Sequence, residues 1–142
     1  MRYDEVAVGD EIPARELQVQ RINLVMYCGA SGDFNVIHWN ERIAKAVGLP
    51  DVIAHGMYTM AQAGRVVTDW AGDPGRVVDY KVRFSKPVVV PDDDQGTKLT
   101  VSGVVEDKLG DNLVRYLPRK NERLAKALGG LHDDIRVGRD DD

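Results

Sequence analysis

The segment from about His55 to Trp70 constrains the fold of this chain more than any other part of the sequence. Its apolar and small residues recur at steps of three and four, which is the spacing of one face of a helix. These residues are Met57, Met60, Ala61, Gly64, Val67 and Trp70. Glycine and proline at 72–75 then end the pattern. The sequence therefore predicts one long helix whose apolar face must be covered by a second layer.

The second half of the chain predicts strands that can supply this layer. From Tyr80 to Phe84, apolar residues alternate with charged ones, which is typical of a strand that buries the face carrying Phe84. The same alternation runs from Lys98 to Glu106. Another strand is expected from Asn112 to Leu117, after a turn at 110–111.

The first half of the chain reads as helical even before the long helix. A helical pattern beginning near Ile22 ends at the glycines 29 and 32, and Asn40 can cap a short helix that Gly48 closes. Helices that precede strands favour an α+β fold, with the helices on one face of an antiparallel sheet.

The region near the C-terminus leaves two interpretations open. Leu124 and Leu128, followed by two glycines, are typical of a short capped helix, whereas the sheet needs more strand in this part of the chain. Ile135 and Val137 can supply some of that strand. Pro118 fits a central strand poorly, because its nitrogen cannot donate to a ladder.

Composition indicates one soluble domain and excludes several classes of partner. The 142 residues are 43% hydrophobic and 30% charged, as in an ordinary globular domain. The net charge of −4 argues against a nucleic-acid binder, and no apolar run has the length of a membrane span. The acidic start lacks the basic region of a signal peptide, so we expect a cytoplasmic protein. Cys28 is the only cysteine, which excludes an internal disulfide and an all-cysteine metal cage.

The strongest local motif is the run from Ser31 to His38, with sequence SGDFNVIH, which places a carboxylate and an imidazole five residues apart. Asp33 and His38 can share the proton transfers that add water to a double bond or remove it. The alternative is that Asp33 only shapes the turn, while His38 fills an interior position. Asn35 can likewise be an ordinary turn residue.

A second motif, from Ile53 to Met57, lies where the long helix is expected to begin. Backbone N–H groups in a first helical turn lack internal partners, so the Gly56 amide can donate to a substrate carbonyl oxygen. The alternative is that Gly56 only relieves crowding at the helix start. His55 is interpreted as a residue of the helix start rather than as a second catalytic histidine.

These two motifs together resemble those of the MaoC-type (R)-specific enoyl-thioester hydratases and dehydratases. The resemblance covers about residues 4–114 and is greatest to the catalytic subunits of actinobacterial (3R)-hydroxyacyl-carrier-protein dehydratases. It implies a single α+β hotdog domain over residues 1–139, in which an antiparallel sheet wraps around one long central helix. Residues 140–142 would form an acidic tail. Val36, Pro91 and the segment 116–134 depart from the family pattern.

The resemblance also implies a reaction and a set of roles. It implies reversible hydration of a trans-2-enoyl thioester of CoA or acyl carrier protein to the (3R)-hydroxyacyl thioester, in fatty-acid metabolism. Asp33 and His38 would activate the water, Asn35 would support them, and the Gly56 amide would be the oxyanion donor. The resemblance implies no cofactor and no metal. The alternatives are a non-catalytic acyl-binding subunit of a hotdog heterodimer and a hotdog acyl thioesterase.

Partners follow from the same resemblance. A hotdog subunit exposes sheet edges, so we expect a dimer with a second copy or with a related hotdog subunit. The small residues of the long helix can either leave room for an acyl chain or simply pack on the sheet; these are Ala61, Ala63 and Gly64. Basic residues can either attract an acidic carrier or face solvent; these are Arg65, Arg76, Lys81 and Arg83.

Overall fold

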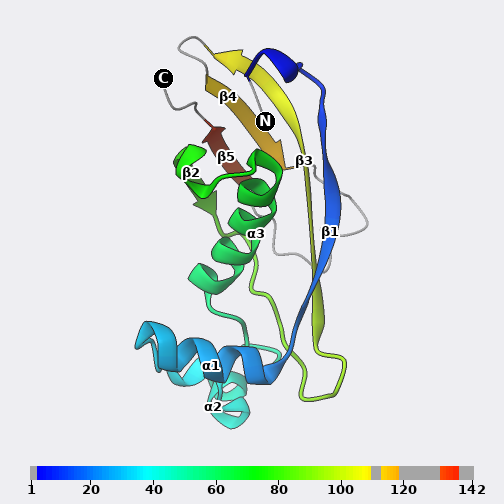
Figure 1. Ribbon diagram of the computed structural model, residues 1–142. Helices are drawn as coiled ribbons and strands as arrows, with labels where there is room; N and C mark the ends of the chain where they lie inside the picture. Colours follow the sequence, from blue (N-terminus) through cyan, green and yellow to red (C-terminus); the bar gives the residue numbers. More distant parts are fainter. Residues whose placement is uncertain (1–2, 110–112, 119–131, 138–142) are drawn as a thin grey trace.

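The computed structural model describes residues 3–109, 113–118 and 132–137 (Figure 1). Its elements in chain order are η1 (Tyr3–Glu5), β1 (Glu11–Val19), α1 (Arg21–Ser31), η2 (Val36–His38), α2 (Glu41–Ala46), α3 (Gly56–Ala71), η3 (Pro74–Arg76), β2 (Val77–Arg83), β3 (Thr97–Leu109), β4 (Leu113–Pro118) and β5 (His132–Val137). The elements labelled η are single turns of 3-10 helix. The expected turn at 110–111, the helix around Leu124 and the acidic tail lie outside the described residues.

The five strands form one antiparallel sheet in the order β1-β3-β4-β5-β2. The long helix α3 packs against β1, β2 and β3, while α1 and α2 lie together beyond its first turn (Figure 1). This confirms the predicted α+β architecture. The strand expected around Ile135 and Val137 is also present as β5.

The three α-helices lie where their capping residues predict. α1 ends at Gly32 and α3 at Gly72, and both glycines adopt the left-handed conformation, with φ of 74° and 82°, that other residues rarely enter. α2 begins after Asn40, whose side-chain oxygen accepts a hydrogen bond from the Ile43 amide at 3.2 Å. None of the helices in the described part of the chain is both long and apolar enough to cross a membrane.

The strand β1 corrects the expectation that the first half of the chain is helical. It pairs with β3 along its length, but its register shifts between Ile12 and Arg15, where Pro13 also interrupts the chain. Ile12 and Val19 are its buried residues, at a spacing of seven rather than an even number. The shift therefore hides the alternation that would have predicted a strand.

Phe84 is a second correction. It was expected on the buried face of a strand, but β2 ends at Arg83 and the Phe84 side chain is 48% exposed. Of the small residues of α3, Ala63 and Gly64 pack against the fold, whereas Ala61 is exposed. Ala63 is buried, and a Cβ on Gly64 would lie 3.1 Å from the Tyr80 ring.

The buried apolar side chains form two core clusters. The upper cluster lies between the C-terminal half of α3 and the sheet and comprises Val6, Ile12, Val66, Val67, Ala71, Val105 and Val114. The lower cluster joins α1 and α2 to the sheet and comprises Val19, Leu24, Ala44, Val52, Ala54, Val88, Val90 and Leu99. Its members at 52–54 and 88–90 lie next in sequence to His55 and to the segment 84–87, which belong to the candidate site.

Candidate active site

The loop between α1 and η2 is fixed by its own polar side chains. The Ser31 hydroxyl donates to the Tyr27 carbonyl at 2.7 Å, and the Asp33 carboxylate accepts from the Asn35 amide at 3.1 Å. The Asn35 side chain in turn accepts from the Ile37 amide at 3.3 Å and so caps η2. The carboxylate and the imidazole of this motif are therefore carried on a loop with a defined conformation.

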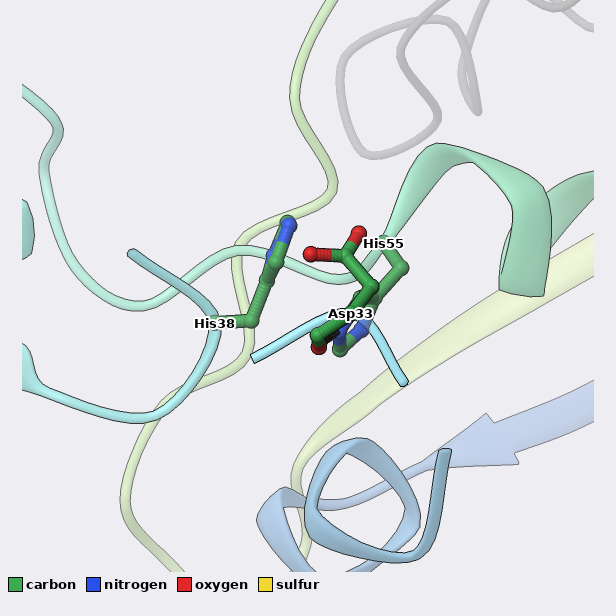
Figure 2. Close-up of side chains that lie close together, drawn as sticks. All are labelled: Asp33, His38 and His55. Carbon is green, nitrogen blue, oxygen red and sulfur yellow. Dashed lines mark hydrogen bonds between the residues drawn. The ribbon is translucent and has the colours of Figure 1, made fainter. Parts of the chain in front are cut away.

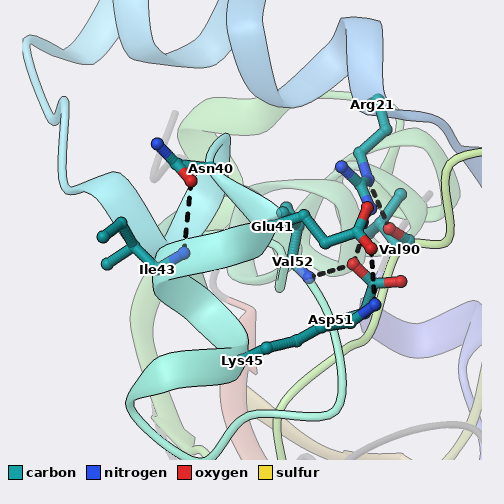
Figure 3. Close-up of polar contacts among 8 residues, drawn as sticks. All are labelled: Arg21, Asn40, Glu41, Ile43, Lys45, Asp51, Val52 and Val90. Atoms are coloured by element: carbon teal, nitrogen blue, oxygen red, sulfur yellow. Dashed lines mark hydrogen bonds and ion pairs between the residues drawn. The ribbon is translucent and has the colours of Figure 1, made fainter.

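An ion-pair network ties this region to the rest of the fold (Figure 3). Arg21 donates to the Val90 carbonyl and to the Asp51 carboxylate, each at 2.6 Å, and lies 3.6 Å from Glu41. Asp51 also accepts from the Val52 amide at 2.7 Å. The start of α1, the helix α2 and the segments at 51–52 and 90 are thus joined through one guanidinium, whose planar fork suits several acceptors.

His38 is buried and has a fixed ring orientation. Its Nδ1 lies 2.7 Å from the Ile53 carbonyl oxygen, which can only accept, so Nδ1 carries a proton and donates. In the neutral ring Nε2 is then an available base. Asp33 is exposed, and Figure 2 shows its carboxylate pointing toward the His38 ring.

His38 and Gly56 line one pocket with a volume of about 390 Å³. The opposite wall consists of Phe84, Ser85, Lys86, Pro87 and Val88. Gly56 is the first residue of α3, so its amide has no acceptor within the helix. The structure thus places a helix-terminal N–H and the His38 imidazole on one cavity, with the Asp33 carboxylate beside that imidazole. Neither Asp33 nor Asn35 is among the residues that line this pocket; the Asn35 side chain caps η2.

His55 is the residue whose part in this site sequence reasoning missed. It occupies the N-cap position of α3 without making a capping hydrogen bond, and its side chain is 1% exposed. Its ring stacks on His38 with centroids 3.7 Å apart, and its Nε2 lies 3.1 Å from the Asp33 carbonyl oxygen. Burial holds the pKa of His55 below its ordinary value. The spacing of the motifs offers no signal for this contact.

Cys28 and Tyr27 complete the buried side of the site. The Cys28 sulfur lies 3.6 Å from Nε2 of His55, and burial, aided by the charge of Asp33, raises the pKa of its thiol. The Tyr27 ring stands edge-on to His55, with centroids 4.9 Å apart. Burial on this side of the site therefore favours the neutral forms of Cys28 and His55.

A metal could be held only by Asp33, His38 and His55 among the described residues. One ligand atom from each lies within 4.8 Å of the other two. Each histidine has one ring nitrogen on a backbone carbonyl, which leaves its other ring nitrogen as the possible ligand atom. The same spacing suits a water molecule between carboxylate and imidazole, because two hydrogen bonds of about 2.8 Å span this distance.

Comparison with known proteins decides the family. The family described as MaoC like domain matches residues 5–117. The chain belongs to this MaoC-like family. It is 40% identical over 79 residues to 3-hydroxyacyl-thioester dehydratase X of Mycobacterium tuberculosis, which is 56% of this chain and 27% of that protein. It is 33% identical over 115 residues to a UPF0336 protein of Streptomyces coelicolor, which is 75% of this chain and 73% of that protein.

Solved structures of the MaoC-like family have the same fold. A MaoC-like dehydratase superposes with a TM-score of 0.83 at 37% identity, over 97% of this chain. The R-hydratase PhaJ1 from Pseudomonas aeruginosa superposes with a TM-score of 0.73 at 26% identity, over 96% of this chain and 82% of that one. This MaoC-like chain spans 42% of the first of these chains and 27% of dehydratase X. The resemblance drawn from the sequence motifs is confirmed.

Proposed function

We propose that the chain catalyses the reversible hydration of a trans-2-enoyl thioester to a (3R)-hydroxyacyl thioester, with Asp33 and His38 activating the water. The observation that carries this proposal is the convergence on one pocket of the His38 imidazole and the Gly56 amide, with the Asp33 carboxylate pointing at the same imidazole. Family membership and the R-hydratase neighbour support the same reaction class.

The proposed reaction needs only proton transfer and a polarised carbonyl. The water oxygen bonds to C3 of the enoyl group as one water proton passes to the Asp33–His38 pair. The electrons of the C2–C3 double bond move toward the thioester carbonyl, whose oxygen becomes enolate-like and accepts a hydrogen bond from the Gly56 amide. A proton then returns from the pair to C2, so that one water has been added. General acid–base catalysis of this kind contributes about 10²–10⁴-fold.

The experiment compares wild type with Asp33→Asn and His38→Ala on a crotonyl thioester. We expect each variant to lose about 10²–10⁴-fold in hydration rate. Asp92→Asn is the matched control, because it changes the same functional group in an exposed loop and should leave the rate unchanged. Equal hydration by wild type and both site variants would refute the assignment of the site.

Two other functions are tested by the same substrate. A hotdog thioesterase would release the free thiol faster than it hydrates the double bond. A non-catalytic acyl-binding subunit would bind the thioester and change it in neither way. The His38 imidazole and Gly56 on one pocket, with the Asp33 carboxylate pointing toward that imidazole, favour the hydratase.

The proposal includes pairing with a second hotdog chain, either another copy or a related subunit. Large apolar side chains near the site are each more than half exposed: Ile22, Val25, Met26, Phe34 and Met57. They lie on α1, on the loop after it and on the first turn of α3, and a paired subunit would cover them. Native mass spectrometry of the chain, alone and co-expressed with a related subunit, tests this. A monomer in both samples would contradict it.

A further inference from the structure

We infer that His55 is a positioning residue for the Asp33–His38 pair, holding the His38 ring by stacking and the Asp33 backbone by a hydrogen bond. This inference rests on the proposed function and assigns a role within the same site. Of His55 and the two residues that it holds, only His38 lines the pocket, so His55 acts on the substrate through the Asp33–His38 pair.

The stacking contact fixes the plane of the His38 ring. The two imidazole centroids are 3.7 Å apart and the rings are inclined by 24°, which is close to van der Waals contact over most of each face. His38 is already held at its Nδ1 by the Ile53 carbonyl. The Ile53 hydrogen bond fixes the position of Nδ1, and the His55 face adds a second constraint, on the tilt of the ring.

The hydrogen bond to Asp33 fixes the main chain that carries the carboxylate. Because the Asp33 carbonyl oxygen can only accept, Nε2 of His55 must carry the proton. His55 Nδ1 is buried and has no hydrogen-bond partner among the described residues. The arrangement therefore selects the neutral tautomer protonated at Nε2, since a proton on Nδ1 would be a buried donor with nothing to bind.

Neutrality of His55 matters for the pair that it holds. The titratable groups that face it are Asp33, His38, Cys28 and Tyr27. A charged His55 would oppose any positive charge that His38 takes up in the reaction, since the rings are only 3.7 Å apart. The buried surroundings of His55 exclude that charge, so that the proton taken from water can reside on His38.

Two variants separate the two contacts. His55→Phe keeps an aromatic face against His38 and removes the donor to Asp33, whereas His55→Gln keeps a donor and removes the aromatic face. We expect each to lower kcat by about ten- to a hundred-fold with KM changed less than threefold, because misplacement by about 1 Å costs up to 10²-fold. Val67→Ala is the control: it lies on the same helix, in the upper cluster, and should cost stability without lowering kcat.

A spectroscopic measurement on the unmodified protein keeps the inference testable if the variants fold poorly. The chain contains three histidines, so their ¹⁵N imidazole signals can be assigned by substitution. We expect His55 to show the neutral tautomer protonated at Nε2 and to gain its second proton only below the pH at which a free imidazole does. A neutral ring protonated at Nδ1, a second proton gained at or above that pH, or wild-type kcat in both folded variants would overturn the inference.

The outcomes also separate this inference from the proposed function. If Asp33→Asn and His38→Ala hydrate like wild type, the site assignment itself fails. If those two variants are inactive while both His55 variants keep wild-type kcat, only the positioning role fails.

Discussion

Replacing Gly56 by proline tests the oxyanion donor directly, because proline removes the amide proton at this position. Gly56 is the first residue of α3, where proline is well tolerated: the missing N–H has no partner in the helix. His55, which precedes it, has φ of −60° and ψ of 134°, a conformation that a residue before proline favours. The backbone therefore accepts the substitution with little strain.

Gly56→Ala is the matched control for the added bulk. A Cβ at residue 56 would lie 3.3, 3.4 and 3.5 Å from three atoms of the Phe84 ring. These contacts are tight by only a few tenths of an ångström, and the half-exposed Phe84 ring can move aside. Alanine keeps the donor, so we expect no more than about a tenfold loss in kcat/KM, which is about 1.4 kcal/mol.

Gly56→Pro should lower the rate further than Gly56→Ala, because proline also removes the hydrogen-bond donor. Removal of one oxyanion donor costs about 2.7–4 kcal/mol, or 10²–10³-fold in kcat. The assay is hydration of a crotonyl thioester followed by its ultraviolet absorbance, with thermal unfolding to confirm the fold. If proline and alanine reduce the rate equally, bulk and not the amide is responsible, and the proposed role of Gly56 is refuted.

Three further predictions follow from the burial and backbone of particular residues. Burial lowers the pKa of His55, so the unfolded chain binds a proton that the folded chain refuses as the pH falls below about 6.5. The free energy of unfolding should therefore drop more steeply from pH 7 to 5.5 in wild type than in His55→Phe. The two slopes should differ by up to about 1.4 kcal/mol per pH unit. Urea unfolding at each pH measures this, and parallel plots of the unfolding free energy against pH would contradict it. Cys28 should react with iodoacetamide at pH 8 far more slowly in the folded than in the urea-unfolded protein, because its thiol is buried and its pKa is raised; equal rates would count against the buried placement. Gly96→Ala should destabilise by about 3 kcal/mol, because φ is 62° and the new methyl would meet the Val19 carbonyl oxygen. Gly9→Ala, at φ of 94° with open space around it, should cost only about 1 kcal/mol, and equal losses on chemical unfolding would refute the clash.

The local motifs of the sequence predicted the parts of the fold that local chemistry decides. Asn40, Gly32 and Gly72 mark helix ends through their own hydrogen bonds or backbone conformations, so these ends were predictable. β1 was not, because a shift of register and Pro13 interrupt its alternation. Its identity as a strand comes from pairing with β3, which lies about ninety residues along the chain.

In the candidate site, too, local motifs were predictable from the sequence, whereas contacts between distant segments were not. Asp33, His38 and Gly56 could be named from their spacing because each motif is short and starts or ends at a helix. The stacking of His55 on His38 could not be predicted, since it depends on how the segment at 53–55 packs against the η2 turn. The pocket wall from Phe84 to Val88 was also missed, because its residues only reach the site once β2 has joined the sheet.

That wall is connected to the segment 116–134, which was expected from the sequence to depart from the family pattern; the family match ends at residue 117. All the residues that line the pocket come from positions 38–88, and no residue of the described strands β4 and β5 is among them. Yet β2 pairs only with β5 in the described sheet, and its last residue, Arg83, lies opposite His132 and immediately before Phe84. Changes in the segment 116–134, which leads into β5, would therefore reach the pocket through β2 and alter its wall. They would leave Asp33 and His38 in place, because these residues are held by hydrogen bonds to His55 and Ile53. Under the proposed function, the departure thus bears on which acyl group fits more than on the proton transfers.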